Sequence, residues 1–528
     1  MSDSSYDVVV IGGGHNGLCA AAYLARVGQK VGVFEARHEE AGAVHTSEAT
    51  VPGFWHNLHA QYMEFIDYMP FYHDFGLLGY GARMIKPECQ IGMAFADGRP
   101  PLLIYLPELE EKTHRSIAAY SKHDADTFTE IRRKVMAKDQ YIASIIYTPR
   151  DPDKTREELL KLWLDLGFAL EDIQKTVKEI IDQTFESSEL RGTLYRQSLE
   201  WGLDPYRATG IAFIVSTIWW CGRHYMVVGG THMLGHAMAS ACFANGVDLR
   251  YNHRVRRILR RNGRVSGIEL EDGRQIDANI VVSNLDVRTT FIDFLEPDGT
   301  TPAMRELLDN WRFGPDNCLG TLSFALHEPP DYKSARHDPD INRCFYTIVG
   351  YDNAEEVGEY IRDAMEGRIP SLPAAGIWVN TLWDPSQAPP GKHAMNGWYF
   401  FPRASDLTPS EWAEVKANYN ARFLALWQEF APNMTRDKVI ADALYTPLDI
   451  EQEIGMPEGD FSHGKPIEGF LDVGDAGGRD LDGTRTDIEG LYLCAGGGAS
   501  AGPGYTAFKA VAEDYKLPEI WKRDDRIY

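Results

Sequence analysis

The start of the chain alternates between apolar runs and polar or glycine-containing turns. Residues 6–11 form a β-branched run that predicts a strand, and residues 18–26 carry apolar side chains at helical spacing. Gly28 ends the helical pattern, and residues 30–34 form a second short apolar run. A strand, a helix and another strand in this order predict a βαβ unit whose two strands are parallel.

Three glycines occupy the turn between the first strand and the helix. Gly12, Gly14 and Gly17 have the spacing Gly-x-Gly-x-x-Gly. This spacing allows a tight turn, close approach of the backbone to a pyrophosphate, and close packing of the helix on the strand. Glu35 follows the second strand, where a carboxylate can accept hydrogen bonds from ribose hydroxyls. The pattern predicts a dinucleotide site and leaves NAD and FAD both open.

A second turn of small residues follows Glu35 almost at once and suggests another backbone loop beside the same pyrophosphate. With these motifs the chain resembles the FAD-dependent flavoproteins with two dinucleotide-binding domains, which include phytoene desaturases, retinol saturase and flavin amine oxidases. The resemblance implies FAD as the cofactor, held in part by Ala36, Arg37, Gly42 and Ala43. The glycine pair usual at the last two positions reads Gly-Ala here.

The resemblance extends to the middle and the end of the chain. Residues 225–284 resemble the segment in which the family returns to its dinucleotide domain, which implies that Val255 contacts the adenine. Residues 490–496 predict a strand that enters glycines, and residues 505–513 predict a helix. In the family such an element completes the flavin site, which implies contacts from Gly496, Gly504, Tyr505 and Thr506. The acid or serine frequent after the first of these glycines is absent.

The rest of the chain predicts a second domain. Residues 108–201 are rich in amphipathic helical patterns, and residues 293–446 contain many aromatic side chains and prolines. In the second region we predict strands over 319–326, 345–349 and 377–382 and helices over 355–365 and 409–430. We therefore expect an α/β protein with a Rossmann-like FAD-binding domain assembled from discontinuous segments, and a mixed-sheet substrate domain with a helical insertion. The FAD-binding domain is assigned to residues 1–85, 226–292 and 451–528, and the substrate-binding domain to residues 86–225 and 293–450.

Composition and charge narrow the function. The 528 residues include 53 Lys and Arg against 77 Asp and Glu, a net charge of -24, which argues against a nucleic-acid partner. The N-terminus lacks the features of a signal peptide, and the apolar run 211–220 reaches only about half of a membrane span. Seven cysteines without a Cys-x-x-Cys pair favour reduced thiols, a cytoplasmic location and no metal site. An arginine-rich run at 254–264 leaves peripheral membrane contact open.

Candidate catalytic residues come from segments that the resemblance brings toward the flavin. His59 is the first choice for a polar group at the reaction site, because a neutral imidazole can accept a proton near pH 7. Tyr505 and His463 are the next candidates, and His224 belongs to a segment, residues 219–225, that lines the substrate tunnel in the family. A buried structural histidine is the alternative interpretation for each of the three histidines.

The function predicted from these features is FAD-dependent dehydrogenation, or desaturation, of a carbon–carbon bond in an apolar isoprenoid or alicyclic substrate. The alternative is a flavin amine oxidase, because Gly504-Tyr505 resembles the start of the helix beside the flavin in those enzymes. A prenyl-binding escort protein without redox chemistry is a third hypothesis, which the intact glycine motif disfavours. The electron acceptor (oxygen, a quinone or a redox protein) and the oligomeric state stay open.

Overall fold

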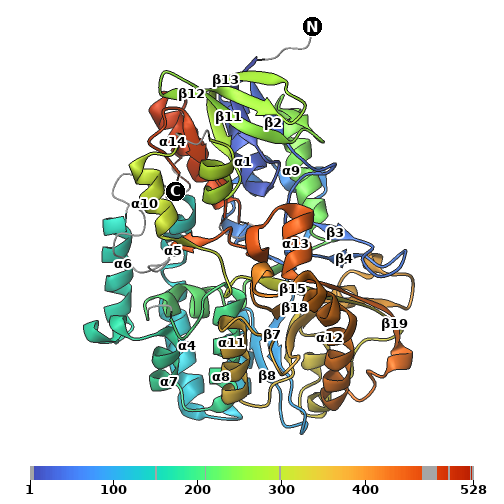
Figure 1. Cartoon of the computed structure of the whole chain (residues 1–528). Helices are drawn as coiled ribbons and strands as arrows, with labels where there is room; N and C mark the ends of the chain where they lie inside the picture. Colours follow the sequence, from blue (N-terminus) through green and yellow to red (C-terminus); the bar gives the residue numbers. More distant parts are fainter. Residues whose placement is uncertain are drawn as a thin grey trace.

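The structure is a computed structural model that describes residues 5–148, 152–207, 210–295, 299–466, 484–496, 500–523, 525 and 528. Two seven-stranded sheets organise these residues, one in the upper and one in the lower part of Figure 1. The predicted α/β class, with a discontinuous Rossmann-like sheet and a second mixed sheet, is confirmed. The exact domain boundaries stay a prediction.

The upper sheet collects its strands from distant parts of the sequence. Its order is β10-β2-β1-β13-β12-β11, and β21 also pairs with β13. Because β1 pairs in parallel with β2 and β13, and β13 in parallel with β21, the chain leaves all four strands at the same edge. The strands are β1 (Ser5–Ile11), β2 (Val31–Phe34), β10 (Asp248–Arg250), β11 (Val255–Arg261), β12 (Arg264–Leu270), β13 (Gln275–Ser283) and β21 (Leu491–Leu493).

Three helices pack beside the upper sheet: α1 (His15–Arg26), α9 (His232–Ala244) and α14 (Gly502–Asp514). Helix α1 lies between the other two and contacts both (Figure 1). Its close approach to β1 requires a glycine, because a Cβ atom on Gly17 would lie 2.3 Å from the Gly12 carbonyl oxygen. The first and last helices of the chain therefore share one hydrophobic core.

The lower sheet has the order β19-β15-β18-β17-β16-β7-β8 and is antiparallel except between β16 and β7. The predicted strand over 319–326 and the predicted helix over 409–430 are present at those positions as β15 and α12. A predicted strand over 377–382 is wrong in its second half, because the backbone turns into a short 3-10 helix at Asn380–Leu382. The strands are β7 (Cys89–Met93), β8 (Leu102–Tyr105), β15 (Leu319–Leu326), β16 (Tyr346–Val349), β17 (Ala375–Trp378), β18 (His393–Phe400) and β19 (Val439–Tyr445).

A group of helices joins the two sheets and covers part of the lower one. Their bounds are α3 (Glu110–Ala118), α4 (Lys122–Met136), α5 (Asp139–Tyr147), α6 (Pro152–Asp165), α7 (Val177–Thr184), α8 (Ser188–Glu200), α10 (Pro302–Asp309), α11 (Ala354–Met365), α12 (Pro409–Phe430) and α13 (Pro447–Ile454). Within the described part of the chain, no helix is both long enough and apolar enough to cross a bilayer. The seven cysteines lie buried as free thiols.

The apolar run 211–220 folds into a π-helix, Phe213–Trp219, rather than an ordinary α-helix. π-helical turns are rare in proteins, and those that occur are often found at functional sites. The chain then enters strand β9 (His224–Val227), which pairs with the short strands β5 (Met63–Glu64) and β6 (Met84–Ile85). The π-helix thus places Phe213 and Trp219 in the core that the helical region shares with the lower sheet.

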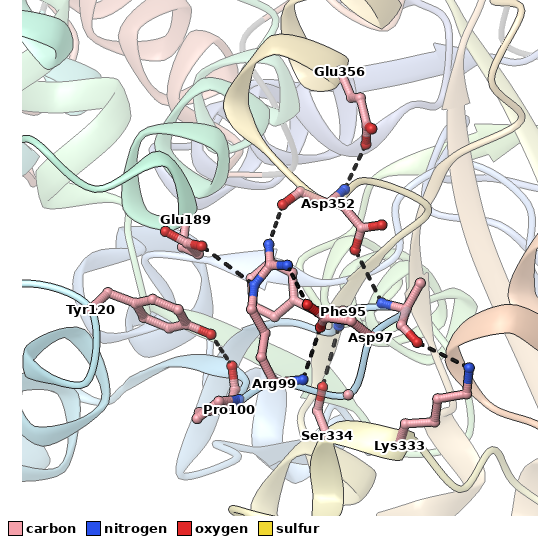
Figure 2. Close-up of polar contacts among 12 residues, drawn as sticks. Phe95, Asp97, Arg99, Pro100, Tyr120, Glu189, Lys333, Ser334, Asp352 and Glu356 are labelled. Atoms are coloured by element: carbon pink, nitrogen blue, oxygen red, sulfur yellow. Dashed lines mark hydrogen bonds and ion pairs between the residues drawn. The ribbon is translucent and has the colours of Figure 1, made fainter.

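A set of polar contacts around Arg99 fastens the β7–β8 connection to the surrounding elements (Figure 2). Arg99 Nε lies 3.3 Å from Glu189 Oε1 of helix α8, and its guanidinium also donates to the backbone carbonyl of Asp352. The Ala96 N–H donates to Asp352 Oδ1 at 3.1 Å, and Lys333 Nζ donates to the Ala96 carbonyl at 2.9 Å. These contacts join one strand connection, helix α8 and the start of α11.

Replacement of Arg99 by alanine should lower the free energy of unfolding by about 1.5–3 kcal/mol, since it removes charge-assisted hydrogen bonds from a half-buried site. Urea unfolding of the purified protein measures the change. Arg254→Ala is the matched control, because the Arg254–Glu271 pair is exposed and 3.7 Å long and should contribute less than about 0.5 kcal/mol. Equal stability losses in both variants would contradict the assignment of Arg99.

Candidate cofactor and reaction site

The first glycine loop lies at the edge where β1 and β2 end. Gly12 has φ +90°, which favours glycine, and Gly14 precedes helix α1 without a side-chain cap on the helix N-terminus. The Glu35 carboxylate accepts hydrogen bonds from Gly13 N at 2.7 Å and from Arg37 N at 2.8 Å. One acid therefore fixes both the glycine loop and the turn after β2, and each oxygen keeps a lone pair for a ribose hydroxyl.

The second small-residue turn lies directly against the first loop. The Ala41 N–H donates to the Gly13 carbonyl at 2.7 Å, and a Cβ atom on Gly42 would lie 3.5 Å from Gly14 Cα. Ala41 and Gly42 both have positive φ, which turns the backbone back onto the first loop. Ala36 and Ala43 lie half-buried beside this contact. Two backbone loops therefore border one narrow space, as a bound pyrophosphate requires.

Helix α14 brings a second uncapped N-terminus to the same region. Its cap residue Ala501 has φ +56° and makes no side-chain capping bond. Asn16 of α1 connects the two ends of the chain, because its Nδ2 donates to the Gly496 carbonyl at 2.8 Å and its Oδ1 accepts from Gly504 N at 3.3 Å. Residues 497–499, which continue the glycine run between these two contacts, lie outside the described residues.

Asn284 closes the site from the end of β13. In the amide orientation that gives both side-chain polar atoms a hydrogen-bond partner, Oδ1 accepts from Gly14 N at 3.2 Å and Nδ2 donates to the Cys494 carbonyl at 3.3 Å. A Cβ atom on Gly14 would lie 2.5 Å from the end of this amide. The sequence analysis assigned no role to Asn16 or Asn284. The position of Asn284 directly after the strand that ends at Ser283 could have indicated its place at the site.

The remaining predicted contacts lie around this frame. Val255 is buried at the start of β11, two residues after His253, whose N–H donates to the Glu35 carbonyl at 2.8 Å. Thr506 is buried in the first turn of α14, and its hydroxyl donates to the Pro503 carbonyl at 3.0 Å. Their direct contact with FAD stays a prediction.

His59 lies on the cofactor side of the site. Its ring centroid is 6.1 Å from that of His45, and neither ring nitrogen has a hydrogen-bond partner among the described residues. Burial, assisted by the nearby His45 and Arg37, holds the pKa of His59 well below its ordinary value. A neutral, buried imidazole beside an arginine fits the role of a hydrogen-bonding group for the cofactor.

Tyr505 occupies a different place from the one expected. It is fully buried, with its ring centroid 5.0 Å from that of Tyr23 on α1 and 6.2 Å from that of Tyr147 on α5. These contacts place the ring in the core shared by the first and last helices, so the geometry favours packing over a role at the flavin. The predicted catalytic role of Tyr505 therefore has no support from its position.

His463 lies in a loop against the C-terminal glycine element. Its backbone has φ +60°, and its carbonyl accepts from Trp311 Nε1 at 3.2 Å. A Cβ atom on Gly496 would lie 2.9 Å from the carbonyl oxygen of the neighbouring Ser462. Burial lowers the pKa of His463, against an opposing effect of Asp286. The predicted proximity of this loop to the flavin element is thus present, whereas a catalytic role stays a prediction.

An aromatic cluster extends from this loop into the region between the sheets. The ring centroids of Phe461 and Trp398 are 6.4 Å apart, and Trp398 Nε1 donates to the His59 carbonyl at 3.0 Å. Tyr62 contacts Trp398, Trp378 and His224, with centroid distances of 5.8, 5.6 and 4.2 Å. Sequence reasoning missed Trp378 and Trp398, because their strands were incompletely or not predicted.

Gly14→Val should give a folded protein without flavin, because the branched side chain would fill the space between the two glycine loops and press on Asn284. The ratio of flavin to protein absorbance after purification measures retention. Gly79→Ala is the control, since a Cβ atom there meets nothing within 4 Å. A folded Gly14→Val protein with a full complement of flavin would refute the site.

Glu35→Ala should weaken FAD binding by about 1.5–3 kcal/mol, the value of charge-assisted hydrogen bonds, which corresponds to roughly 10- to 150-fold in Kd. Titration of the apoprotein with FAD, followed by fluorescence quenching, provides the measurement. Asp363→Ala removes a carboxylate that holds a loop N–H, that of Ser371, in the other half of the molecule and should leave the Kd unchanged. Equal Kd values for wild type and Glu35→Ala would exclude Glu35 from the site.

Comparisons with known proteins agree with this geometry. Residues 17–415 match the family described as flavin containing amine oxidoreductase. The chain is 31% identical to a component of the limonene dehydrogenase of Castellaniella defragrans, over 99% of this chain and 97% of the relative. It is 23% identical to a zeta-carotene-forming phytoene desaturase of Myxococcus xanthus, over 51% of this chain and 48% of the relative.

A solved oxidoreductase from Methanosarcina mazei has the same fold, with a TM-score of 0.60, 17% identity, and coverage of 96% of this chain and 99% of that one. The predictions of a phytoene-desaturase-like flavoprotein, of FAD and of a redox enzyme are confirmed. The chain therefore belongs to the flavin-containing amine oxidoreductase family and is an FAD-dependent oxidoreductase.

Proposed function

We propose that this enzyme dehydrogenates a carbon–carbon bond of an apolar isoprenoid or alicyclic substrate, which binds between the two sheets. The observation that carries the proposal is the aromatic cluster of Tyr62, Trp378, Trp398, His224 and Phe461, which begins at the flavin element and extends away from it. Aromatic and other apolar walls with few polar groups are typical of pockets for apolar ligands. The relative named limonene dehydrogenase supports the same substrate class.

The titratable groups beside Tyr62 add no net charge at neutral pH. Burial lowers the pKa of His224 to about 3 and raises the pKa of Glu64 to about 8, so both are uncharged at pH 7. Arg196 and Glu200 of helix α8 form a buried ion pair with an N–O distance of 2.6 Å. An uncharged surround favours a hydrocarbon over an ammonium ion, since an isolated buried cation is costly.

When bound, FAD supplies hydride acceptance: it takes one hydrogen with two electrons from a substrate carbon. The chain's own residues have three tasks. The glycine loops, Asn16 and Asn284 hold the cofactor, and His59 forms a hydrogen bond to it. The aromatic cluster orients the substrate and excludes water. Oxidation of amines, the alternative function, is supported by the family name. The structural argument for amine oxidation was a tyrosine, Tyr505, beside the flavin. The packing of the Tyr505 ring against Tyr23 weakens that argument.

A cytoplasmic location remains a prediction from the sequence, and the electron acceptor, the oligomeric state and peripheral membrane contact stay open. In the arginine-rich hairpin, acids compensate much of the positive charge. Arg257 lies 2.8 Å and Arg256 3.6 Å from Glu269, and Arg264 lies 3.4 Å from Glu489. These pairs favour a self-compensated surface over a strong attraction to anionic lipid.

Anaerobic mixing with limonene should bleach the flavin absorbance, and cyclohexylamine should leave it unchanged. Stopped-flow absorbance measures the reduction, and gas chromatography should detect a product with two hydrogens fewer. Reduction by the amine with peroxide formed in air would establish the alternative. Failure of limonene and of a carotenoid precursor such as phytoene to reduce the flavin would refute the proposal.

A further inference from the structure

His224 is a buried histidine whose ring bonds to no other described residue. The side chain is 1% exposed, and neither Nδ1 nor Nε2 has a hydrogen-bond partner in the described part of the chain. Its neighbours are aromatic: the ring centroid lies 4.2 Å from that of Tyr62, 6.5 Å from Trp201 and 6.4 Å from Phe345. Leaving a buried polar group without a partner is unfavourable, so a purely structural role would favour an apolar residue here.

The backbone of His224 is held by one buried glutamine. Its N–H donates to Gln90 Oε1 at 2.6 Å, and its carbonyl accepts from Gln90 Nε2 at 3.2 Å. Gln90 is fully buried on β7 and also donates to the Pro87 carbonyl at 2.5 Å. A glutamine that holds both backbone groups of one residue fixes the direction in which that side chain leaves the strand.

Glu64 lies directly opposite His224 in the antiparallel pairing of β5 and β9. Side chains of directly paired residues share one face of a sheet, so Glu64 and His224 leave their strands toward the same side. Glu64 is also buried, its Oε2 has no partner among the described residues, and it interacts electrostatically with Tyr62. The fold therefore sets two buried proton-carrying side chains on one face of this strand pair, next to Tyr62.

We infer that His224, backed by Glu64, is the base that accepts the proton released from the substrate skeleton during dehydrogenation. The inference rests on the proposed function. One substrate carbon loses a hydride with both electrons of its C–H bond, which bound FAD would accept. As the hydride leaves, the adjacent carbon loses a proton to a ring nitrogen of His224, and the electron pair of that C–H bond becomes the new π bond, so that no isolated carbon cation is left in the site. Two hydrogens and two electrons leave the substrate in total.

The test compares His224→Gln with wild type in anaerobic stopped-flow experiments with limonene. The variant should keep its FAD and its apparent Kd for limonene, while the limiting rate of flavin reduction falls by about 10²- to 10⁴-fold, as for loss of a general base. A packing defect would instead raise the apparent Kd at a nearly unchanged limiting rate, and that result would overturn the inference. Glu64→Gln should reduce the limiting rate by a smaller factor, on the order of tenfold.

Two other histidines serve as comparisons. His56→Gln is the matched control, because His56 is equally buried but bonds through its ring nitrogens to Thr50 and Asn396, each at 2.9 Å, and should keep the wild-type limiting rate. A rate loss in His59→Gln together with an unchanged rate in His224→Gln would move the base to His59 and overturn the inference.

Two further outcomes are decisive. If His224→Gln cannot be purified with FAD, the Glu64→Gln variant tests the inference instead. An unchanged limiting rate of flavin reduction in Glu64→Gln would then overturn it. Wild-type enzyme that limonene and phytoene fail to reduce would refute the proposed function, and the inference with it. Wild-type reduction with an unaffected His224 variant refutes the inference alone.

Discussion

Hydrogen bonds from the amide of Asn16 hold the first and the last helix of the chain together. They join the Gly496 carbonyl and the Gly504 N–H to the first turn of α1. Because a Cβ atom on Gly504 would lie 2.1 Å from the Asn16 carbonyl oxygen, the two backbones meet as closely as they can. Both helix N-termini are uncapped and face one region, and their partial positive charges suit a cofactor with phosphates and a reducible ring.

The polar frame at the strand ends contrasts with the aromatic interior next to it. On the cofactor side, buried donors and acceptors such as Glu35 and Asn284 bond to backbone groups of the loops. In the aromatic interior, burial lowers the pKa of His224 and raises the pKa of Glu64, so that both side chains are uncharged at pH 7. The transition takes place around residues 58–62, where the His59 carbonyl bonds to Trp398 and the Tyr62 ring joins the cluster.

Sequence reasoning succeeded where local pattern decides structure. Strands β1 and β2 are short apolar runs next to glycines, and the positions of the motif from Gly12 to Glu35 each have a local steric or hydrogen-bonding reason that points to a dinucleotide. The lower sheet was predicted only in part. Strands β7 and β18 include buried polar or glycine positions such as Gln90, Asn396 and Gly397, which hide the apolar pattern. Long-range pairing, rather than local preference, makes these residues strands.

By itself the sequence determined the α/β class, the dinucleotide loop and the family resemblance that implies FAD, since these depend on residues close together in the chain. Only the tertiary structure decided which polar groups lie together in the interior. Glu64 and His224 are paired across β5 and β9, although most of the helical region separates these two strands in the sequence. Tyr505 packs against Tyr23 because α14 packs on α1. Burial and partner choice arise when distant segments meet, so the spacing of residues along the chain does not encode them.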